Sequence, residues 1–502
     1  MPPSPVTAPE GTYDAVLIGA GIMSATLATL LHQVQPDWRI AVIERLDEIA
    51  GESTGPWNNA GTGHAALCEM NYTPQAPDGT VCIDAAVKIN AQFHVARQLW
   101  AHLVTTGALP APDSFIHPAP HLAFVTGSDV DYLRRRHEAM TAHPLFAQTA
   151  QMTYTEDPAT IADWAPLVMG GRDPRQPVAA TRSEAGTDVD FGVLTRHMLS
   201  ALARTGTVEI HTGAHVSGLA RGRGGDAASR WRIRLRARGG ETTCEAGFVF
   251  VGAGGGALPL LQSAGLDEVR GYGGFPVSGQ FWRTTDPSVI ADHHGKVYGR
   301  ASAGAPPMSV PHLDARLVEG QASVVFGPFA GFSPRFLKHG SLLDLARSVR
   351  GHNLTPMLSV GAHNTSLLRY LAAELAASRA DRAADLRTFY PQADPDRWEE
   401  ITAGQRVQVI KRAGRGGVLQ FGTEVVAAAD GSIAGLLGAS PGASVAAPVM
   451  LEVLARCFPE RVDRWRPALQ QMIGSYGTDL ARDPDLAART AARTAEILAL
   501  PR

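Results

Sequence analysis

The chain is 502 residues long, with 45% hydrophobic and 19% charged residues and a formal net charge of −3 at pH 7. This length exceeds a single compact core, so we expect about two to three domains. The nearly balanced charge and the lack of a Lys/Arg run exclude nucleic acid as a partner.

Cysteine usage indicates the redox compartment. Cys68, Cys82, Cys244 and Cys457 lie far apart and form no C-x-x-C pair. We therefore expect no disulfide framework, no metal site and a reducing, cytoplasmic setting.

We expect neither an N-terminal signal peptide nor a membrane-spanning segment. Residues 1–12 are polar and proline-rich and lack the basic and apolar regions of a signal peptide. The longest apolar stretch, residues 247–261, contains five glycines and is too short to span a bilayer. Any membrane contact is expected to be peripheral.

Residues 13–44 are the most informative stretch of the chain. An apolar run at 14–18 predicts a buried parallel strand, a glycine turn follows, and 25–31 predicts a helix. Residues 40–43 predict a second strand. This strand–turn–helix–strand order is the context that a dinucleotide-binding glycine turn requires.

The residue types in this turn suit a pyrophosphate. Gly19 permits the tight turn, and Gly21 lets the backbone approach the phosphates at a helix N-terminus. Ser24 replaces the third glycine of the fingerprint but is small enough for close packing. Glu44, after the second strand, can accept hydrogen bonds from a ribose. Further expected cofactor contacts are Ala20, Ile22 and Met23 in the turn and Arg45 after the second strand.

The loop at 51–64 is dense in small hydroxyl and amide residues and can bury little apolar surface. We expect it to hydrogen-bond the cofactor; the alternative is a solvated surface loop. The expected contacts are Ser53, Thr54, Asn58, Asn59, Gly61 and Thr62. His64 closes the loop, and by itself would more often be a structural histidine.

Two further glycine turns occur downstream. A strand at 248–251 ends in Gly252, Ala253 and Gly254 before a helix, and a strand at 432–437 ends in a glycine loop before the helix 445–456. A nicotinamide-binding domain needs no such additional turns, whereas an FAD-binding domain does, because its chain leaves and returns to one sheet. The last loop suits the pyrimidine edge of a reduced flavin. The expected contacts here, with one from an earlier strand, are Gly438, Ser440, Pro441, Gly442, Ala443, Ser444 and Val216.

We predict an α/β fold: a discontinuous Rossmann-like FAD-binding domain with an inserted α+β substrate-binding domain. The C-terminal segment is basic and helical, and is either a solvated cap or a membrane-facing surface. The predicted segments are 12–110, 186–268 and 400–456 for FAD, 111–185 and 269–399 for substrate, and 457–502 at the C-terminus.

Two segments carry candidate substrate residues. Residues 305–314 contain three prolines and His312, so they present one imidazole rigidly beside a strand. Residues 403–412 predict an alternating strand that carries Arg406 and Lys411.

Taken together, these segments resemble the malate:quinone oxidoreductases, within the D-amino-acid-oxidase-like superfamily. The resemblance covers about residues 12–455, and is carried by 17–25, 57–64, 304–314, 326–330 and 403–408. It implies oxidation of (S)-malate to oxaloacetate in the tricarboxylic acid cycle, with electrons passed through FAD to a membrane quinone. It also implies a peripheral protein on the cytoplasmic face of the bacterial inner membrane.

Oxidation of a 2-hydroxy acid needs a base, cations for the carboxylates and a nearby flavin. His312 is the expected base, and Arg406 the expected carboxylate clamp, because a planar guanidinium binds a carboxylate at two points. A salt bridge within the sheet is the alternative for Arg406. Lys411 is a candidate for the second carboxylate or a solvated lysine. His64 resembles the histidine beside the flavin ring in this superfamily.

Three other functions are alternatives for these residues. An L-2-hydroxyglutarate-type oxidoreductase uses the same chemistry on a longer diacid, and has counterparts of His312 and of Gly327 and Pro328. An NAD-dependent dehydrogenase would not need the two later glycine turns. A non-catalytic flavin-binding protein would give no reason for both His312 and Arg406.

Overall fold

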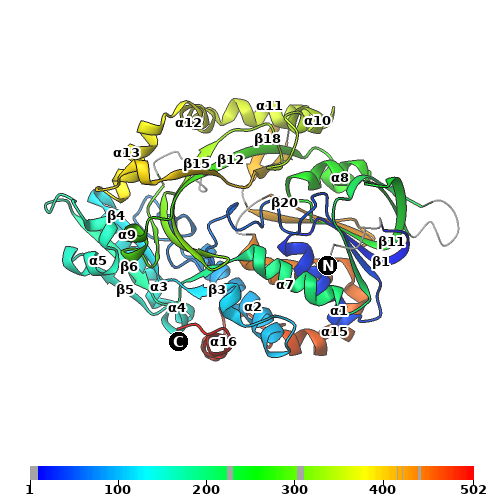
Figure 1. The fold of residues 1–502 in the computed structure, drawn as a ribbon, viewed down its shortest axis with the longest axis horizontal. Coiled ribbons are helices and arrows are strands. Elements are labelled where there is room, and N and C mark those ends of the chain that lie inside the picture. The colour runs from blue at the N-terminus through cyan, green and yellow to red at the C-terminus, as the bar shows by residue number, and fades with distance from the viewer. Residues whose placement is uncertain are drawn as a thin grey trace.

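The computed structural model describes residues 9–222, 230–301, 310–414, 416–420, 422–438 and 442–501. These residues form an eight-stranded sheet and a ten-stranded sheet, together with a short two-stranded sheet. The two large sheets lie side by side, with helices over their outer faces (Figure 1).

The eight-stranded sheet has a parallel centre. Its strand order is β19-β20-β11-β1-β2-β8, with β9 and β10 continuing antiparallel from β11. Because β20, β11, β1, β2 and β8 run parallel, their carboxyl ends share one edge. The strands are β1 (Gly11–Ile18), β2 (Ile40–Ile43), β8 (Val208–His211), β9 (His215–Arg221), β10 (Trp231–Ala237), β11 (Gly240–Val251), β19 (Thr423–Ala427) and β20 (Ile433–Gly438).

Strand β1 shows why this sheet forms. Ala15 and Leu17 pack into the core on one face, while Val16 and Ile18 pack into the core on the other. A strand that is covered on both faces must be apolar throughout, which is the pattern of a central parallel strand.

The ten-stranded sheet is mainly antiparallel. Its order is β18-β17-β12-β15-β14-β13-β4-β6-β5, and β16 pairs with β12. The strands are β4 (His121–Thr126), β5 (Met152–Thr155), β6 (Val178–Ser183), β12 (Gly273–Thr284), β13 (Lys296–Tyr298), β14 (His312–Val318), β15 (Gln321–Gly331), β16 (Glu399–Thr402), β17 (Arg406–Ala413) and β18 (Gly416–Gln420); β3 (Ile116–Pro118) pairs separately with β7 (Thr187–Val189).

The sheets divide the chain differently from the predicted segments at one place. Strands β16, β17 and β18 lie within the 400–456 segment that we assigned to the FAD-binding domain, yet they pair in the ten-stranded sheet. The reason is that β12 is long enough to pair with β17 at one end and with β15 and β16 at the other. If sheets define the domains, the last FAD-binding segment begins with β19.

Helices fill the remaining layers. One of them has a side-chain N-cap: the N–H of Val193 donates to Oδ1 of Asp190, 2.9 Å away. The helices are α1 (Ile22–Val34), α2 (Asp84–Thr105), α3 (Val130–Ala142), α4 (Pro144–Thr149), α5 (Pro158–Trp164), α6 (Pro166–Met169), α7 (Phe191–Ala203), α8 (Ala257–Ser263), α9 (Pro287–Ala291), α10 (Asp344–Ser348), α11 (Leu354–His363), α12 (Thr365–Ala376), α13 (Arg379–Phe389), α14 (Ala446–Cys457), α15 (Pro459–Met472) and α16 (Pro484–Ile497).

The C-terminal helices turn their apolar faces inward. Trp465, Leu469 and Met472 of α15 join the same core as α1 and α2, and Ala495 of α16 joins it too. In the described ranges, no helix is both long enough and apolar enough to cross a membrane.

Candidate active site

Two of the glycine turns are in direct contact at the carboxyl edge of the parallel strands. A β-carbon on Gly19, whose φ is +96°, would lie 2.5 Å from the carbonyl oxygen of Gly252. A β-carbon on Gly252 would lie 2.4 Å from Oγ of Ser24. Any larger residue would fill this cradle, so the two turns form one site.

The third turn reaches the same edge. Gly438 ends β20, which pairs with β11, and a β-carbon on Gly442 would lie 3.8 Å from the terminal methyl carbon of Met23. Ala443 and Ser444 then lead into α14. Ser440 and Pro441 lie outside the described residues, as do residues 302–309 of the predicted histidine loop.

Backbone N–H groups fix the acid at the end of β2. The N–H groups of Ala20 and Leu46 donate to the two carboxylate oxygens of Glu44, each at 2.8 Å. The N–H of Ile22, at the start of α1, donates to Oγ1 of Thr54 at 3.2 Å. Both carboxylate oxygens of Glu44 are therefore fixed at the carboxyl end of β2.

The residues of this edge fit an FAD. The glycine cradle leaves room for a pyrophosphate, the helix N-terminus and Glu44 supply the groups that bind phosphate and ribose, and the hydroxyls of Ser24 and Ser444 are buried without a hydrogen-bond partner among the described residues. Buried polar atoms without partners are typical of a ligand site.

The structure shows the protein neighbours of two further predicted contacts, Arg45 and Val216. Arg45 donates to Oε1 of Glu52 at 2.7 Å and to the carbonyl of His339 at 3.0 Å, so it ties the loop to a distant segment. Val216 is buried in β9, two residues after Ala214, whose N–H donates to the carbonyl of Glu44 at 2.9 Å.

The loop at 51–64 is closed by its own amides. The Asn58 side-chain amide donates to the carbonyl of Glu52 at 2.6 Å, and that of Asn59 donates to the carbonyls of Gly55 and Ser53 at 2.9 and 3.1 Å. Both amide groups therefore shape the loop from within. Asn58 and Thr62 are buried, so these residues do not belong to a solvated loop.

A buried ion cluster anchors this loop to the second sheet. Oδ1 of Asp188 lies 2.9 Å from Nζ of Lys296 and 2.8 Å from Nε of Arg316. Lys296 also donates to the carbonyl of Ala60 at 2.9 Å, and Arg316 to that of Asn59 at 2.7 Å.

Gly61, at φ +63°, is required beside this cluster, because its β-carbon would lie 2.4 Å from Cζ of Arg316. The cluster was not predicted from the sequence, since its members lie far apart in the chain. One signal was present: His312, Asp314 and Arg316 alternate along one face of a strand, where buried charges are unusual.

His312 opens β14 and is held from two sides. Its Nδ1 lies 2.8 Å from Oδ2 of the fully buried Asp314, and its ring stacks on Tyr298 at 4.4 Å with 7° between the planes. The Tyr298 hydroxyl lies 2.7 Å from Oγ1 of Thr62, within hydrogen-bond distance. Nδ1 thus faces the carboxylate, which leaves Nε2 for a substrate.

Asp314 is a charged partner for this imidazole. Burial raises the pKa of its carboxyl, but His312, Lys296 and Arg316 together outweigh burial and lower the pKa below its usual value.

Arg406 opens β17 opposite Val277 of β12. Burial lowers the pKa of its guanidinium, and the nearby hydroxyls of Tyr298 and Tyr72 act in the other direction. Among the ion pairs of the described residues, none involves Arg406, so the expected alternative of a sheet salt bridge is not observed there. Arg406 is half-buried, and a guanidinium without a carboxylate partner is suited to an anionic ligand.

His64 joins the same group of rings. Its Nδ1 pairs with the buried carboxylate of Glu69, and its ring meets Tyr72 edge-on at 6.4 Å. Burial raises the pKa of Glu69, but the neighbouring His64 outweighs burial and lowers the pKa to about 2. Tyr72 and Tyr298 both interact with Arg406, so they connect His64 with His312.

Lys411 does not join this group, which corrects our prediction for it. Its Nζ lies 2.5 Å from Oε1 of Glu424 and over the ring of Tyr272. Lys411 lies five positions after Arg406 on β17, an odd spacing that places the two side chains on opposite faces of the strand. The distance between the two positions along the strand is about 17 Å.

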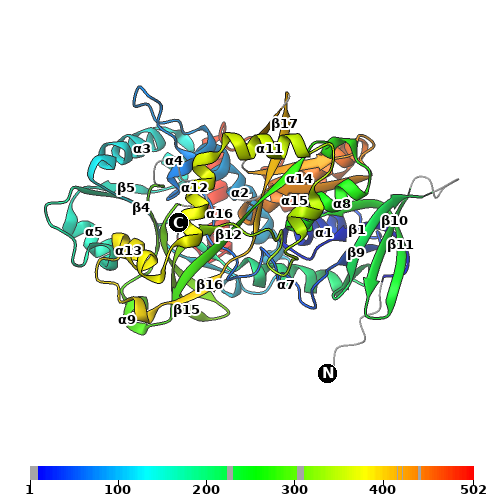
Figure 2. The ribbon, with the colours of Figure 1, turned by 90° about the horizontal axis from the view of Figure 1, so that it is seen from above.

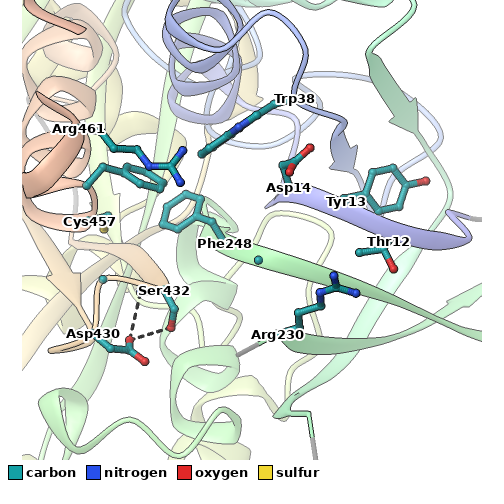
Figure 3. Close-up of a pocket in the computed structure, with 13 residues that line it drawn as sticks. Thr12, Tyr13, Asp14, Trp38, Arg230, Phe248, Asp430, Ser432, Cys457 and Arg461 are labelled. Carbon is teal, nitrogen blue, oxygen red and sulfur yellow. Dashed lines mark hydrogen bonds between the residues drawn. The ribbon is translucent and has the colours of Figure 1, made fainter. Parts of the chain in front are cut away.

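A separate cavity lies at the amino end of the parallel strands (Figure 3). It has a volume of about 390 Å³ and is lined by Asp14, Trp38, Phe248, Asp430 and Arg461, among others. None of the predicted site residues lines it. Ligands of open α/β sheets bind at the carboxyl ends of the strands, so this cavity is not the candidate active site.

Comparison with solved structures defines the class. The fold matches an FAD-bound L-α-glycerophosphate oxidase from Mycoplasma pneumoniae, with a TM-score of 0.58 and 14% identity over 89% of this chain and 94% of that one. It also matches glycine oxidase from Geobacillus kaustophilus, with a TM-score of 0.57 and 12% identity over 89% and 95% of the two chains. The chain thus has the fold of the FAD-dependent oxidoreductases of the D-amino-acid-oxidase type.

Sequence comparison defines the family. The sequence model of the family malate:quinone oxidoreductase (Mqo) matches residues 11–500. A probable malate:quinone oxidoreductase of Micrococcus luteus is 56% identical over 96% of this chain and 97% of its own length, and one of Leifsonia xyli is 55% identical over 97% and 98%. The chain belongs to the malate:quinone oxidoreductase family.

Proposed function

We propose that this chain oxidises (S)-malate to oxaloacetate, with FAD as its cofactor and a quinone as the final electron acceptor. The observation that carries the proposal is a half-buried Arg406 without a carboxylate partner among the described residues, near the Tyr298 that stacks on His312, an imidazole that Asp314 also holds. Family membership supplies the substrate and the acceptor.

His312 acts as the base. When bound, FAD accepts the hydride from C2 of malate, and with it both electrons. Nε2 of His312 takes the proton of the C2 hydroxyl as the C=O bond forms, and the charge of Asp314 stabilises the resulting imidazolium. Stacking on Tyr298 keeps the ring in one orientation throughout.

Arg406 acts as the clamp. Its guanidinium can hold the C1 carboxylate at two points, which fixes the direction of the C2–H bond. His64, held by Glu69 and Tyr72, is proposed to position the flavin ring. Lys411 has no part in this scheme, because it pairs with Glu424.

We further propose that the protein works as a peripheral protein on the cytoplasmic face of the bacterial inner membrane. A quinone acceptor dissolved in lipid supports this location. An L-2-hydroxyglutarate-type activity is not favoured, because the family match covers nearly the whole chain.

The test is anaerobic mixing of the purified yellow protein with malate, 2-hydroxyglutarate or lactate while flavin absorbance is followed. Malate alone should bleach the flavin rapidly. Rapid bleaching by 2-hydroxyglutarate and none by malate would replace the proposal with the rival activity.

A further inference from the structure

The large apolar side chains that remain exposed are confined to one region. Among the described residues they are Leu342, Leu343, Val349, Leu354, Leu358, Leu368, Leu375 and Val418. All eight lie on α10, α11, α12, their connecting loops and β18, which we call the α10–α12 face. A concentration of this kind marks an interaction surface.

The two longer helices of this face are amphipathic. On α11, Pro356 and Val360 are buried against the sheet, whereas Leu354 and Leu358, four residues apart, point outward. The inner side of α11 packs closely on β18, because a β-carbon on Gly417 of that strand would lie 2.4 Å from the Pro356 carbonyl oxygen.

Helix α12 repeats the arrangement. Leu367 and Leu371 are buried, while Leu368 and Leu375, seven residues apart, are 39% and 59% exposed. Residues with these spacings lie on one side of a helix. The outer sides of α11 and α12 therefore each present exposed leucines, and Leu342 and Leu343 are exposed directly before α10.

Charge around these leucines indicates the partner. Residues 333–376, through the end of α12, contain five basic residues and two acids, in a chain whose net charge is −3. Of the acids, Asp344 accepts the backbone N–H groups of Phe336 and Ser341, and Glu374 is half-buried, with a carboxyl pKa that burial raises. The basic residues are Arg335, Lys338, Arg347, Arg350 and Arg369; of these, Lys338 is turned inward, where its Nζ donates to Oδ1 of Asn58 and to the Thr402 carbonyl. Leucines among cations suit an interface with anionic lipids.

The α10–α12 face lies opposite the C-terminal helices. Figure 1 shows α10, α11 and α12 along the upper edge and α15 and α16 along the lower edge, and Figure 2 looks down onto α11 and α12. The basic C-terminal segment was our other candidate for a membrane-facing surface, but its apolar side chains are buried and no large exposed one lies in its described part.

The face is also close to the candidate site. Val418 pairs with Lys411, which is five residues along β17 from Arg406. The distance along this strand is about 17 Å. A bilayer on this face would therefore lie at the far end of the same hairpin that carries the substrate clamp.

We propose that the α10–α12 face docks the protein on an anionic lipid bilayer, with Leu342, Leu358 and Leu375 entering the interface. The inference rests on the proposed function, because a lipid-dissolved quinone is what makes a membrane the partner. Arg347 and Arg369, both exposed, then face the lipid phosphates.

The test uses the full-length, FAD-loaded protein sedimented with vesicles of phosphatidylcholine alone or mixed in equal parts with phosphatidylglycerol. The wild type should bind the mixed vesicles and bind phosphatidylcholine far less. Replacing Leu342, Leu358 and Leu375 together by Gln should weaken binding by about 1,000-fold, since each leucine contributes about tenfold. Arg347→Gln with Arg369→Gln should weaken it about 30-fold.

The matched control is Arg489→Gln with Arg493→Gln on α16, where both arginines are exposed. It should bind vesicles as the wild type does. Bleaching of the flavin by malate in vesicle-free buffer should be unchanged in every variant, which separates docking from the proposed function. If malate fails to bleach the wild type while vesicle binding follows the pattern above, the docking surface stands and the proposed function falls.

Three results would overturn the docking surface: a wild type that ignores the mixed vesicles, a triple leucine variant that binds as tightly as the wild type, or a loss of binding in the α16 control. If the wild type does not bind vesicles, light scattering shows what the face does instead. A dimeric wild type and a monomeric triple variant would be the decisive pair of results. The face would then be an interface between two copies of the chain.

Discussion

The edge that holds FAD and the group around His312 are built in different ways. At the FAD edge, Gly19, Glu44 and Gly252 each directly follow a strand, and parallel pairing alone brings them together. Around His312, the partners come from β13, β14, β17 and two loops, and buried charges hold them. The first region depends on the space that glycines leave beside the backbone, and the second depends on side-chain electrostatics. Substitutions in the first should therefore abolish FAD binding, whereas those in the second should change the rate of flavin reduction or the affinity for malate.

The largest effect is expected at the FAD edge. Gly21→Val should abolish FAD binding, because the side chain blocks the approach of the pyrophosphate, while the only described atom near its β-carbon is Oγ1 of Thr54 at 3.0 Å. Flavin absorbance per protein after purification is the measurement. Gly239→Val is the control, since no atom lies within 4 Å of its β-carbon. A variant that keeps stoichiometric FAD would show that the glycine edge is misassigned.

Next in size is the loss of the base. His312→Gln should leave FAD and malate bound but slow flavin reduction by about 10²-fold or more. Stopped-flow reduction over a range of malate concentrations separates rate from affinity. His363→Gln, on the outer side of α11, should behave as the wild type. An unchanged limiting rate would refute the base assignment.

A smaller effect is expected for the clamp. Arg406→Lys keeps the charge but loses the two-point grip, so malate affinity should fall about tenfold to 100-fold together with the rate. Lys411→Met should change neither parameter, because Lys411 pairs with Glu424. If Lys411→Met weakened malate binding and Arg406→Lys did not, the two assignments would have to be exchanged.

The smallest effect concerns acid stability around the second sheet. Burial lowers the pKa of His121 and of His293 to about 4. Since the unfolded state takes up these protons near the usual value of about 6.5, the stability is complete above that pH and is lost as pH falls toward 4. Each histidine should cost about 1.4 kcal/mol per pH unit in this window.

Urea denaturation at a series of pH values between neutral and mildly acidic measures this loss. His293→Gln should reduce the slope of stability against pH, because Gln does not titrate. His117→Gln, at a partly exposed position, is the matched control. A slope that His293→Gln leaves unchanged would mean that this histidine is not buried in its neutral form.

The sequence by itself predicted the three glycine turns, the strands that precede them and His312 and Arg406 as candidates. Each of these depends on local features: an apolar run, a glycine turn, or a charged residue at a strand end. The family resemblance rests on the same segments, and the full-length family match confirms it.

Only the tertiary structure decided how the substrate residues are partnered. Lys411 and Arg406 share a strand, but an odd spacing sends them to opposite faces, and Glu424 neutralises Lys411. Asp188, Lys296 and Arg316 are more than 100 residues apart at their widest, yet burial makes them one cluster. Likewise, α12 and α15 both carry apolar residues at helical spacing, and only packing shows that α12 leaves Leu368 and Leu375 exposed whereas Trp465, Leu469 and Met472 of α15 are buried. Local sequence specifies which side chains an element carries, whereas their neighbours depend on contacts between distant segments.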